Sequence, residues 1–270
     1  DYDQAMEAFA RGASHATHLY NGMDGLHHRK PGIIAAAMDA GASAELICDG
    51  LHIHPAAIRV AYKLYGEKLN LVSDSLRCAG MPDGDYELGG QPIFLSGGVA
   101  RLADGVLAGS CTDLFTCMRR AMGFGEEHFV VGMSARLEEY KGQGTLLRAA
   151  AMCREQAPDM RFLLLGDGSC AAHYRALARE LGLEDRVIFA GFVEDIAPYY
   201  GIMSVNVNAS FGTETSSLAL SEGMSVGVPA VASDYGGNPK MIFDGENGLL
   251  FPTKDEHRLT ELLARLYEDR

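Results

Sequence analysis

Apolar runs alternate with amphipathic stretches along most of the chain. In the second half the apolar runs are short and rich in valine, leucine and phenylalanine, which is typical of buried parallel strands. They predict strands at 129–133, 161–165, 187–190, 205–208 and 229–232. The stretches between them have the helical period and predict helices at 142–155, 171–181, 216–226 and 255–268. This alternation predicts a Rossmann-like doubly wound α/β domain.

The first half also alternates strands and helices, but less regularly. Its pattern predicts strands at 16–20, 44–48 and 69–72 and helices at 4–10 and 55–65, the second with a proline near its first turn. Between 86 and 106 the pattern changes to short strands punctuated by glycines, which predicts a β-hairpin appendage. The two patterns meet at 123–128, so the sequence predicts two domains, 1–125 and 126–270.

Composition and charge narrow the classes of function. The chain has 270 residues, of which 47% are hydrophobic and 22% charged, as in globular proteins. The formal net charge is -13 and no basic stripe is present, which argues against nucleic acid and anionic membranes as partners. No apolar run is long enough to span a bilayer, and no leader-like segment is recognisable. The six cysteines form no CxxC pair and are expected to be reduced thiols of a cytoplasmic protein.

Histidine is unevenly distributed, with six of the nine between residues 15 and 54. The same half contains the segments SHATHLYNGMDGLHHRKPG (14–32), ICDGLHIHP (47–55), LVSDS (71–75), RCAGMPDGDYELGGQP (77–92) and GVLAGS (105–110). In this order they closely resemble N-acetylglucosamine-6-phosphate deacetylases of the amidohydrolase superfamily. The resemblance implies a (β/α)8 barrel, in which one or two divalent metal ions, zinc or similar, activate water for attack on the N-acetyl amide of a sugar phosphate.

The resemblance gives two residues a chemical role. His18 is implied to be a metal ligand, and Asp74, at the end of a strand, the general base and then the acid toward the leaving amine. Without the resemblance, His18 would be a hydrogen-bonded structural residue and Asp74 a helix cap. The spacing of His52 and His54 also allows a metal pair, but the resemblance favours a substrate contact for His52 and leaves His54 as a helix-start residue.

The resemblance further implies that Asn21, Gly22 and His52 contact the sugar phosphate. Arg29 is expected to bind its phosphate, because a guanidinium presents a fixed fork of donors to phosphate oxygens. In this family the arginine often acts across a dimer interface, which predicts a homodimer through the barrel part.

This half is expected to be only part of a barrel. The family's metal site also takes a glutamate and an earlier histidine from segments that precede Asp1, and a complete barrel has about 250 residues. A catalytic zinc ion usually takes three protein ligands. We therefore expect a partial barrel with an incomplete metal site, and no deacetylase activity from this chain alone.

The second half carries a different set of motifs. The segments FVVGMSARLEEYKGQGTLLRAA (129–150), LLLGDGS (163–169), LGLEDRVIFAGFVEDIAPYY (181–200) and ETSSLALSEGMSVGVPAVASDYGGNPKMI (214–242) resemble the C-terminal domain of family 4 glycosyltransferases, which have the GT-B fold. The resemblance implies that residues 126–270 bind a nucleotide-sugar donor, and that the family transfers the sugar with retention of configuration and without a metal. It also implies that the acceptor cleft needs a second Rossmann domain.

The departing diphosphate must be neutralised by protein groups in such a reaction. Arg136 and Lys141 follow a strand and precede a helix, so both are expected to bind the phosphates. The backbone amides near Thr215 and Ser216, at the start of the helix predicted at 216–226, are expected to assist. The family usually has glycine at the position of Thr215, which leaves the donor sugar open.

The resemblance assigns the other donor contacts. Gly166 and Gly168 are expected to let the backbone pass close to the nucleotide, and the main chain around Val193 to contact the base. Glu222 is implied to hold the ribose hydroxyls, and Glu214 the donor sugar hydroxyls or amides beside the phosphates.

Three functions remain open from the sequence. The first is a chimera of amino-sugar and carbohydrate metabolism, derived from a deacetylase and a retaining glycosyltransferase, with both sites incomplete. The second is a non-catalytic module that binds a nucleotide sugar. The third is a genuine bifunctional deacetylase and glycosyltransferase. The missing family parts on both halves favour the chimera.

Overall fold

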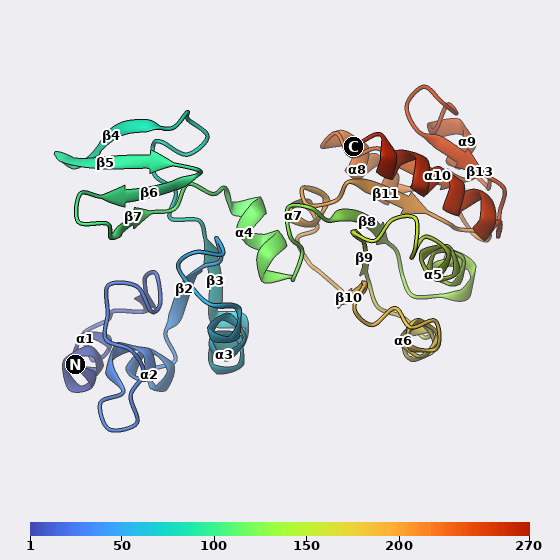
Figure 1. Cartoon of the computed structure of the whole chain (residues 1–270). Helices are drawn as coiled ribbons and strands as arrows, with labels where there is room; N and C mark the ends of the chain where they lie inside the picture. Colours follow the sequence, from blue (N-terminus) through green and yellow to red (C-terminus); the bar gives the residue numbers. More distant parts are fainter. Residues whose placement is uncertain (216) are drawn as a thin grey trace. The chain divides into compact units, whose positions relative to one another are not determined.

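The computed structural model describes residues 1–215 and 217–270, which form two compact units, Asp1–Gly125 and Glu126–Arg270 (Figure 1). We call them unit 1 and unit 2. None of the helices in this described part of the chain has both the length and the apolar character needed to cross a membrane.

Unit 1 contains a parallel sheet of three strands in the order β1-β2-β3. Its elements are α1 (Tyr2–Ala10), β1 (His15–Ala16), α2 (Gly32–Asp39), β2 (Ser43–Ile47), α3 (Pro55–Tyr65), the 3-10 turn η1 (Gly66–Lys68), β3 (Leu69–Val72) and α4 (Leu114–Ala121). Ala44 and Leu46 alternate along β2 and are buried in one cluster with Ile34 of α2. Ser43 and Glu45, on the other face of β2, are only partly buried.

The sequence predicts that unit 1 is part of a (β/α)8 barrel. Its described residues form an open sheet of three parallel strands, so the (β/α)8 barrel is not confirmed. The strand predicted at 16–20 is wrong beyond Ala16, because His18 and Tyr20 have positive φ angles of 32° and 76° and the chain turns there. Helix α2 was not predicted, since its apolar run has no polar face that would reveal the helical period.

The helix predicted at 55–65 is confirmed as α3, and local chemistry explains its start. The Nδ1 atom of His54 accepts a hydrogen bond from the backbone N–H of Ala56 at 3.1 Å, and Pro55 occupies the first turn. His54 is therefore a helix-start residue, as expected.

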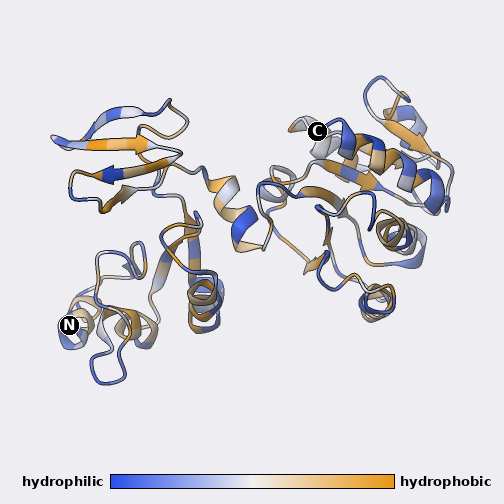
Figure 2. Ribbon diagram, in the orientation of Figure 1, coloured by the Kyte–Doolittle hydropathy of each residue, from blue (hydrophilic) through white to orange (hydrophobic). Residues whose placement is uncertain are grey.

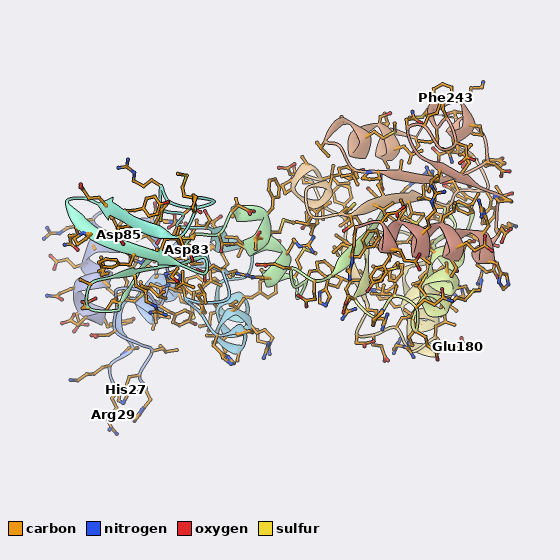
Figure 3. All side chains as sticks on the ribbon, turned by 45° about the horizontal axis from the view of Figure 1, so that its top comes forward. His27, Arg29, Asp83, Asp85, Glu180 and Phe243 are labelled. Carbon is orange, nitrogen blue, oxygen red and sulfur yellow. The ribbon has the colours of Figure 1, made fainter. Side chains whose placement is uncertain are left out.

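The glycine-rich segment of unit 1 forms a separate antiparallel sheet in the order β4-β5-β6-β7, in agreement with the predicted hairpins. The strands are β4 (Gly84–Leu88), β5 (Gln91–Ser96), β6 (Val99–Leu102) and β7 (Leu107–Gly109). Ile93 and Leu95 of β5 are buried with Cys78 and Ala100 in a small core of their own. Figure 3 labels Asp83, which directly precedes β4, and Asp85, which lies in it.

Unit 2 is built on six parallel strands in the order β10-β9-β8-β11-β12-β13. They are β8 (Phe129–Ser134), β9 (Met160–Leu165), β10 (Val187–Gly191), β11 (Val205–Asn208), β12 (Ala230–Ser233) and β13 (Leu249–Phe251). Numbered along the chain, the order is 3-2-1-4-5-6, the Rossmann arrangement. This confirms the predicted doubly wound sheet and adds β13, which is too short to be recognised in the sequence.

Helices cover both faces of this sheet. They are the turn η2 (Glu139–Lys141), α5 (Gln143–Met152), α6 (Ala171–Glu180), α7 (Ala197–Tyr200), α8 (Leu218–Ser225), α9 (Asn238–Met241) and α10 (Glu256–Glu268). Helices α5, α6 and α10 pack on one face around Phe162 and Leu263, while Leu220 of α8 packs with Ala232 on a second cluster. Figure 2 shows hydrophobic central strands, and hydrophobic and hydrophilic residues alternating along α10.

Candidate functional site

The strand order of unit 2 creates a crevice. The chain proceeds from β8 through β9 to β10 on one side and then returns to β11 on the other side of β8. The loops that follow β8 and β11 therefore diverge at the carboxyl edge of the sheet, which is where open α/β sheets bind ligands. The loop after β8 contains Arg136 and Lys141, and the loop after β11 contains Glu214.

A charged pair joins these two loops. The Nζ atom of Lys141 lies 2.8 Å from Oε2 of Glu214, and the Ser210 hydroxyl donates to the same oxygen at 2.9 Å. The side chains are only 17% and 7% exposed, so the two charges compensate each other in a partly desolvated place. Ser210 is a member of this site that the sequence did not reveal, because a lone serine after a strand carries no signal.

Arg136 is the more exposed cation of the site. Its Nη2 donates to the Tyr140 hydroxyl at 3.1 Å, and the side-chain amide of Gln143 donates to its main-chain oxygen at 2.8 Å. Arg136 also lines a cavity of about 430 Å³ together with Gly166 and Val193. Three of the residues expected to contact the donor thus share one cavity.

The walls of this cavity come from loops that follow β8, β9 and β10. Besides those three residues it is lined by Asp167, Ile196 and Phe192, whose ring is 79% exposed. An exposed aromatic ring beside an arginine suits a planar, partly charged ligand such as a nucleotide base. The sequence pointed to Val193 by resemblance and missed Phe192, which resembles an ordinary strand-end residue.

Gly166 and Gly168 are required by the contact of two loops. A Cβ atom on Gly166, whose φ is 126°, would lie 2.2 Å from the carbonyl oxygen of Ala135, and one on Gly168 would lie 2.6 Å from that of Leu137. The backbone N–H of Leu137 donates to the oxygen of Asp167 at 3.0 Å. The glycines therefore let the loop after β9 continue the pairing of β8 with β9, and their approach to a nucleotide stays a prediction.

The start of α8 differs from the prediction by two residues. The helix begins at Leu218, and the Ser217 hydroxyl caps it by accepting a hydrogen bond from Leu220 N at 3.2 Å. Thr215 is exposed just before this cap. The contact predicted for Ser216 lies outside the described residues. Glu222, one turn into the helix, accepts a hydrogen bond from the Tyr200 hydroxyl at 3.1 Å.

In unit 1, the turn after β1 holds the first group of predicted site residues. His18 Nδ1 lies 2.9 Å from the backbone oxygen of Asn21, which leaves Nε2 available as an acceptor. Gly22 continues the turn with a φ of 63°. Glu45 of β2 anchors the approach to this turn by accepting a hydrogen bond from the Thr17 hydroxyl at 2.5 Å, a contact that lowers the pKa of the Glu45 carboxyl.

His52 belongs to an ion pair that the sequence did not reveal. Its Nδ1 lies 2.7 Å from Oδ2 of the fully buried Asp49. Burial favours a higher pKa for Asp49, but hydrogen bonds from the His52 side chain and from the backbone N–H groups of His52 and Leu51 outweigh it and lower the pKa to about 2. The bond to Asp49 raises the pKa of His52 above 6.5, and the negative charge of Asp74 adds to this.

Asp74 and Arg29 are both exposed. Asp74 lies two residues beyond β3 with a φ of 50°, and its backbone oxygen accepts a hydrogen bond from Ser110 N at 3.1 Å. Figure 3 shows Arg29 and His27 at the end of a loop that projects from unit 1. The catalytic role of Asp74, the phosphate contact of Arg29 and the homodimer stay predictions.

The donor set of unit 1 does not fit a catalytic zinc ion. Within residues 1–215 and 217–270, no group of three or more histidine, cysteine, aspartate or glutamate side chains is arranged to hold a metal ion. A catalytic zinc takes about three protein ligands, and His18 is the single one that the resemblance predicts in this chain. We therefore derive no hydrolytic step through a metal.

Comparison with known proteins gives different relatives for different parts of the chain. The family model of the glycosyl transferases group 1 matches residues 128–269. The chain is 45% identical over 115 residues to N-acetylglucosamine-6-phosphate deacetylase of Vibrio furnissii, an alignment that covers 42% of this chain and 29% of that protein. It is 34% identical over 150 residues to the putative glycosyltransferase EpsD of Bacillus subtilis, covering 56% of this chain and 39% of EpsD.

A solved structure shows the same fold class. Anabaena HepE, determined in complex with UDP and glucose, is similar over 99% of this chain and 72% of its own, with a TM-score of 0.55 and 20% identity. At this identity the likeness concerns the fold alone.

Both resemblances read from the motifs are confirmed, although the chain spans less than half the length of either the deacetylase or EpsD. Because the family model covers more than half of its residues, the chain belongs to the glycosyl transferases group 1 family.

Proposed function

We propose that unit 2 binds the nucleoside diphosphate part of a nucleotide-sugar donor at the carboxyl edge of its sheet. One observation carries the proposal: Arg136, Lys141 and Glu214 stand on the two loops that diverge at the switch point between β8 and β11. A diphosphate carries several negative charges, and a site without a metal must neutralise them with side chains and backbone amides.

The contacts suggest how the site receives its ligand. The phosphates bind Arg136 and compete with Glu214 for the Lys141 ammonium, which lies 2.8 Å from Glu214. The released Glu214 carboxylate then accepts hydrogen bonds from the sugar hydroxyls. The base enters the cavity beside Val193, and Glu222 accepts from the ribose. The backbone amide of Thr215 completes the phosphate contacts.

Calorimetric titration of the full chain with UDP, GDP and ADP tests the proposal. We expect one diphosphate to bind, and Arg136→Ala to weaken it by about 10- to 100-fold, the effect of losing a hydrogen bond to a charged group of about 1.5–3 kcal/mol. Arg179→Ala is the matched control, because Arg179 is exposed in the last turn of α6. Absence of binding by all three diphosphates refutes the proposal.

We further propose that residues 1–125 are part of an amidohydrolase barrel, and that the chain joins parts of a deacetylase and of a retaining glycosyltransferase. The support is that each relative is matched over less than half of its own length. Deacetylation and sugar transfer are activities of whole proteins, and for this chain they stay proposals. Sequencing across 123–128 in independent genomic preparations tests whether the junction arose outside the genome. We expect separate reading frames for the two parts, and one continuous frame in every preparation contradicts this and makes the chain a natural fusion.

A further inference from the structure

Tyr200 is a buried tyrosine that joins two elements of unit 2. It is the last residue of α7 and is only 1% exposed. Its hydroxyl donates to Oε2 of Glu222, on α8, at 3.1 Å. The side chain of Ser134, the last residue of β8, acts on the same phenol and lowers its pKa, against the larger effect of burial. Burial raises the pKa of the phenol, so the hydroxyl keeps its proton and acts as a donor.

For packing alone, a phenylalanine would serve at position 200 as well as a tyrosine does. A buried hydroxyl without a partner is costly, so its presence requires the acceptor that Glu222 supplies. Glu222 itself is exposed, and an exposed glutamate does not need a buried partner for its own solvation. The link is therefore better explained by what it does to the orientation of Glu222 than by the stability of either residue alone.

The link also lies beside the proposed donor site. Ser134 lines the cavity that contains Arg136 and Val193. Tyr200 holds Glu222 from the end of α7, so the position of the glutamate is tied to a buried residue of the domain. An unrestrained glutamate side chain loses conformational entropy when a ligand binds. A glutamate already held by one oxygen loses less, so it binds the ligand at a lower entropic cost.

We propose that Tyr200 is a positioning residue that holds one oxygen of Glu222, so that the other is directed to the vicinal hydroxyls of the ribose of the bound nucleotide. This inference rests on the proposed function, because it takes Glu222 as the ribose contact. Tyr200 itself touches no ligand and acts only through Glu222.

The test compares ligands that differ only in these hydroxyls. Full-length wild type and Tyr200→Phe are titrated with UDP and with 2′,3′-dideoxy-UDP, and with the corresponding GDP and ADP pairs. We expect the wild type to prefer the ribose form. In Tyr200→Phe the Kd of the ribose form rises roughly 5- to 10-fold, the effect of about one neutral hydrogen bond, while that of the dideoxy form changes by less than about twofold.

Three variants serve as comparisons. Tyr199→Phe removes a hydroxyl one residue away and keeps the preference. Glu222→Gln abolishes the preference, and adding Tyr200→Phe to it has no further effect. Glu222→Asp keeps the charge but draws it back by one methylene from both Tyr200 and the ribose, so it also loses the preference. Retention of the preference in this variant overturns the inference even if Tyr200→Phe does not fold.

Each contrary result has its own meaning. Equal weakening of both ligand forms in Tyr200→Phe makes Tyr200 merely structural and overturns the inference, as does a preference that survives Glu222→Asp. Equal binding of both forms by the wild type overturns the inference while the proposed nucleotide binding stands. Failure of every diphosphate to bind the wild type overturns both.

Discussion

Variants of the Lys141–Glu214 pair are predicted to affect the stability of unit 2 and its diphosphate binding differently. Lys141→Met keeps most of the apolar stem and removes the ammonium. Glu214, 7% exposed, then keeps the hydrogen bond from the neutral Ser210 hydroxyl but loses the cation at 2.8 Å that compensates its charge. Removing one partner of a fully buried pair costs roughly 3–5 kcal/mol, and an exposed pair contributes about 0–1 kcal/mol. The exposures of 17% and 7% place this pair near the buried case. We expect Lys141→Met to lower the free energy of unfolding by about 2–3 kcal/mol.

The double variant provides the control. Glu214→Gln added to Lys141→Met removes the uncompensated charge, and a glutamine oxygen still accepts from Ser210. We therefore expect the double variant to be more stable than Lys141→Met alone by about 1–2 kcal/mol. Binding does not follow stability, since both variants lack the ammonium and bind the preferred diphosphate about 10- to 100-fold more weakly than the wild type.

Urea denaturation followed by far-UV circular dichroism measures the stabilities, and titration calorimetry measures binding. A diphosphate added during denaturation identifies the transition of unit 2, because only that transition shifts. The reasoning is refuted if Lys141→Met changes the stability of unit 2 by less than about 0.5 kcal/mol, the range of ordinary surface substitutions. It is also refuted if the double variant is less stable than Lys141→Met.

Three further predictions concern other parts of the chain. Gly166→Ala is expected to lower the free energy of unfolding by about 3 kcal/mol or more, because its Cβ would lie 2.2 Å from the Ala135 oxygen. Gly227→Ala, at a φ of 83° with open space around it, should lower it by only about 1–2 kcal/mol. Equal losses in thermal unfolding would contradict this. Because the pKa of His52 is raised, unit 1 is expected to lose urea resistance as the pH rises above 6.5, and because the pKa of Asp49 is about 2, it loses resistance again as the pH falls from 3.8 toward 2. If a His52→Asn variant still shows the loss above pH 6.5, another group causes it. After dialysis against metal-free buffer, elemental analysis should find well under one zinc ion per chain, since no three ligands are gathered among the residues that the structure describes. One retained ion per chain would show that this assessment is wrong.

The sequence predicted best what depends on local pattern. The valine- and leucine-rich runs located β8, β9, β10, β11 and β12, because a strand buried on both faces leaves a continuous apolar signal. The motifs also located Arg136, Lys141 and Glu214 near the crevice. The pairing of Lys141 with Glu214 joins residues 73 positions apart, and such a contact depends on the strand order that brings the two loops together.

Other features could not be found from local signals. The turn at His18 and Tyr20 uses positive φ angles without a glycine at either residue, so the strand seemed to continue. Asp49 resembled a turn residue after a strand, although it is the buried partner of His52. Tyr200 looked like one more core aromatic, since only its hydroxyl distinguishes it from phenylalanine.

The interlocking of the loops after β8 and β9 has a consequence for how this domain can diversify. Ala135 pairs with Leu165, the last residue of β9, and Leu137 pairs with Asp167 between Gly166 and Gly168, so an insertion in either loop would break the register of both. The loops after β8 and β9 are therefore expected to keep their lengths and to change only together. Adaptation to a new nucleotide or sugar then falls to the loops beyond β10 and β11, where Phe192 and Thr215 are exposed and free to change one at a time.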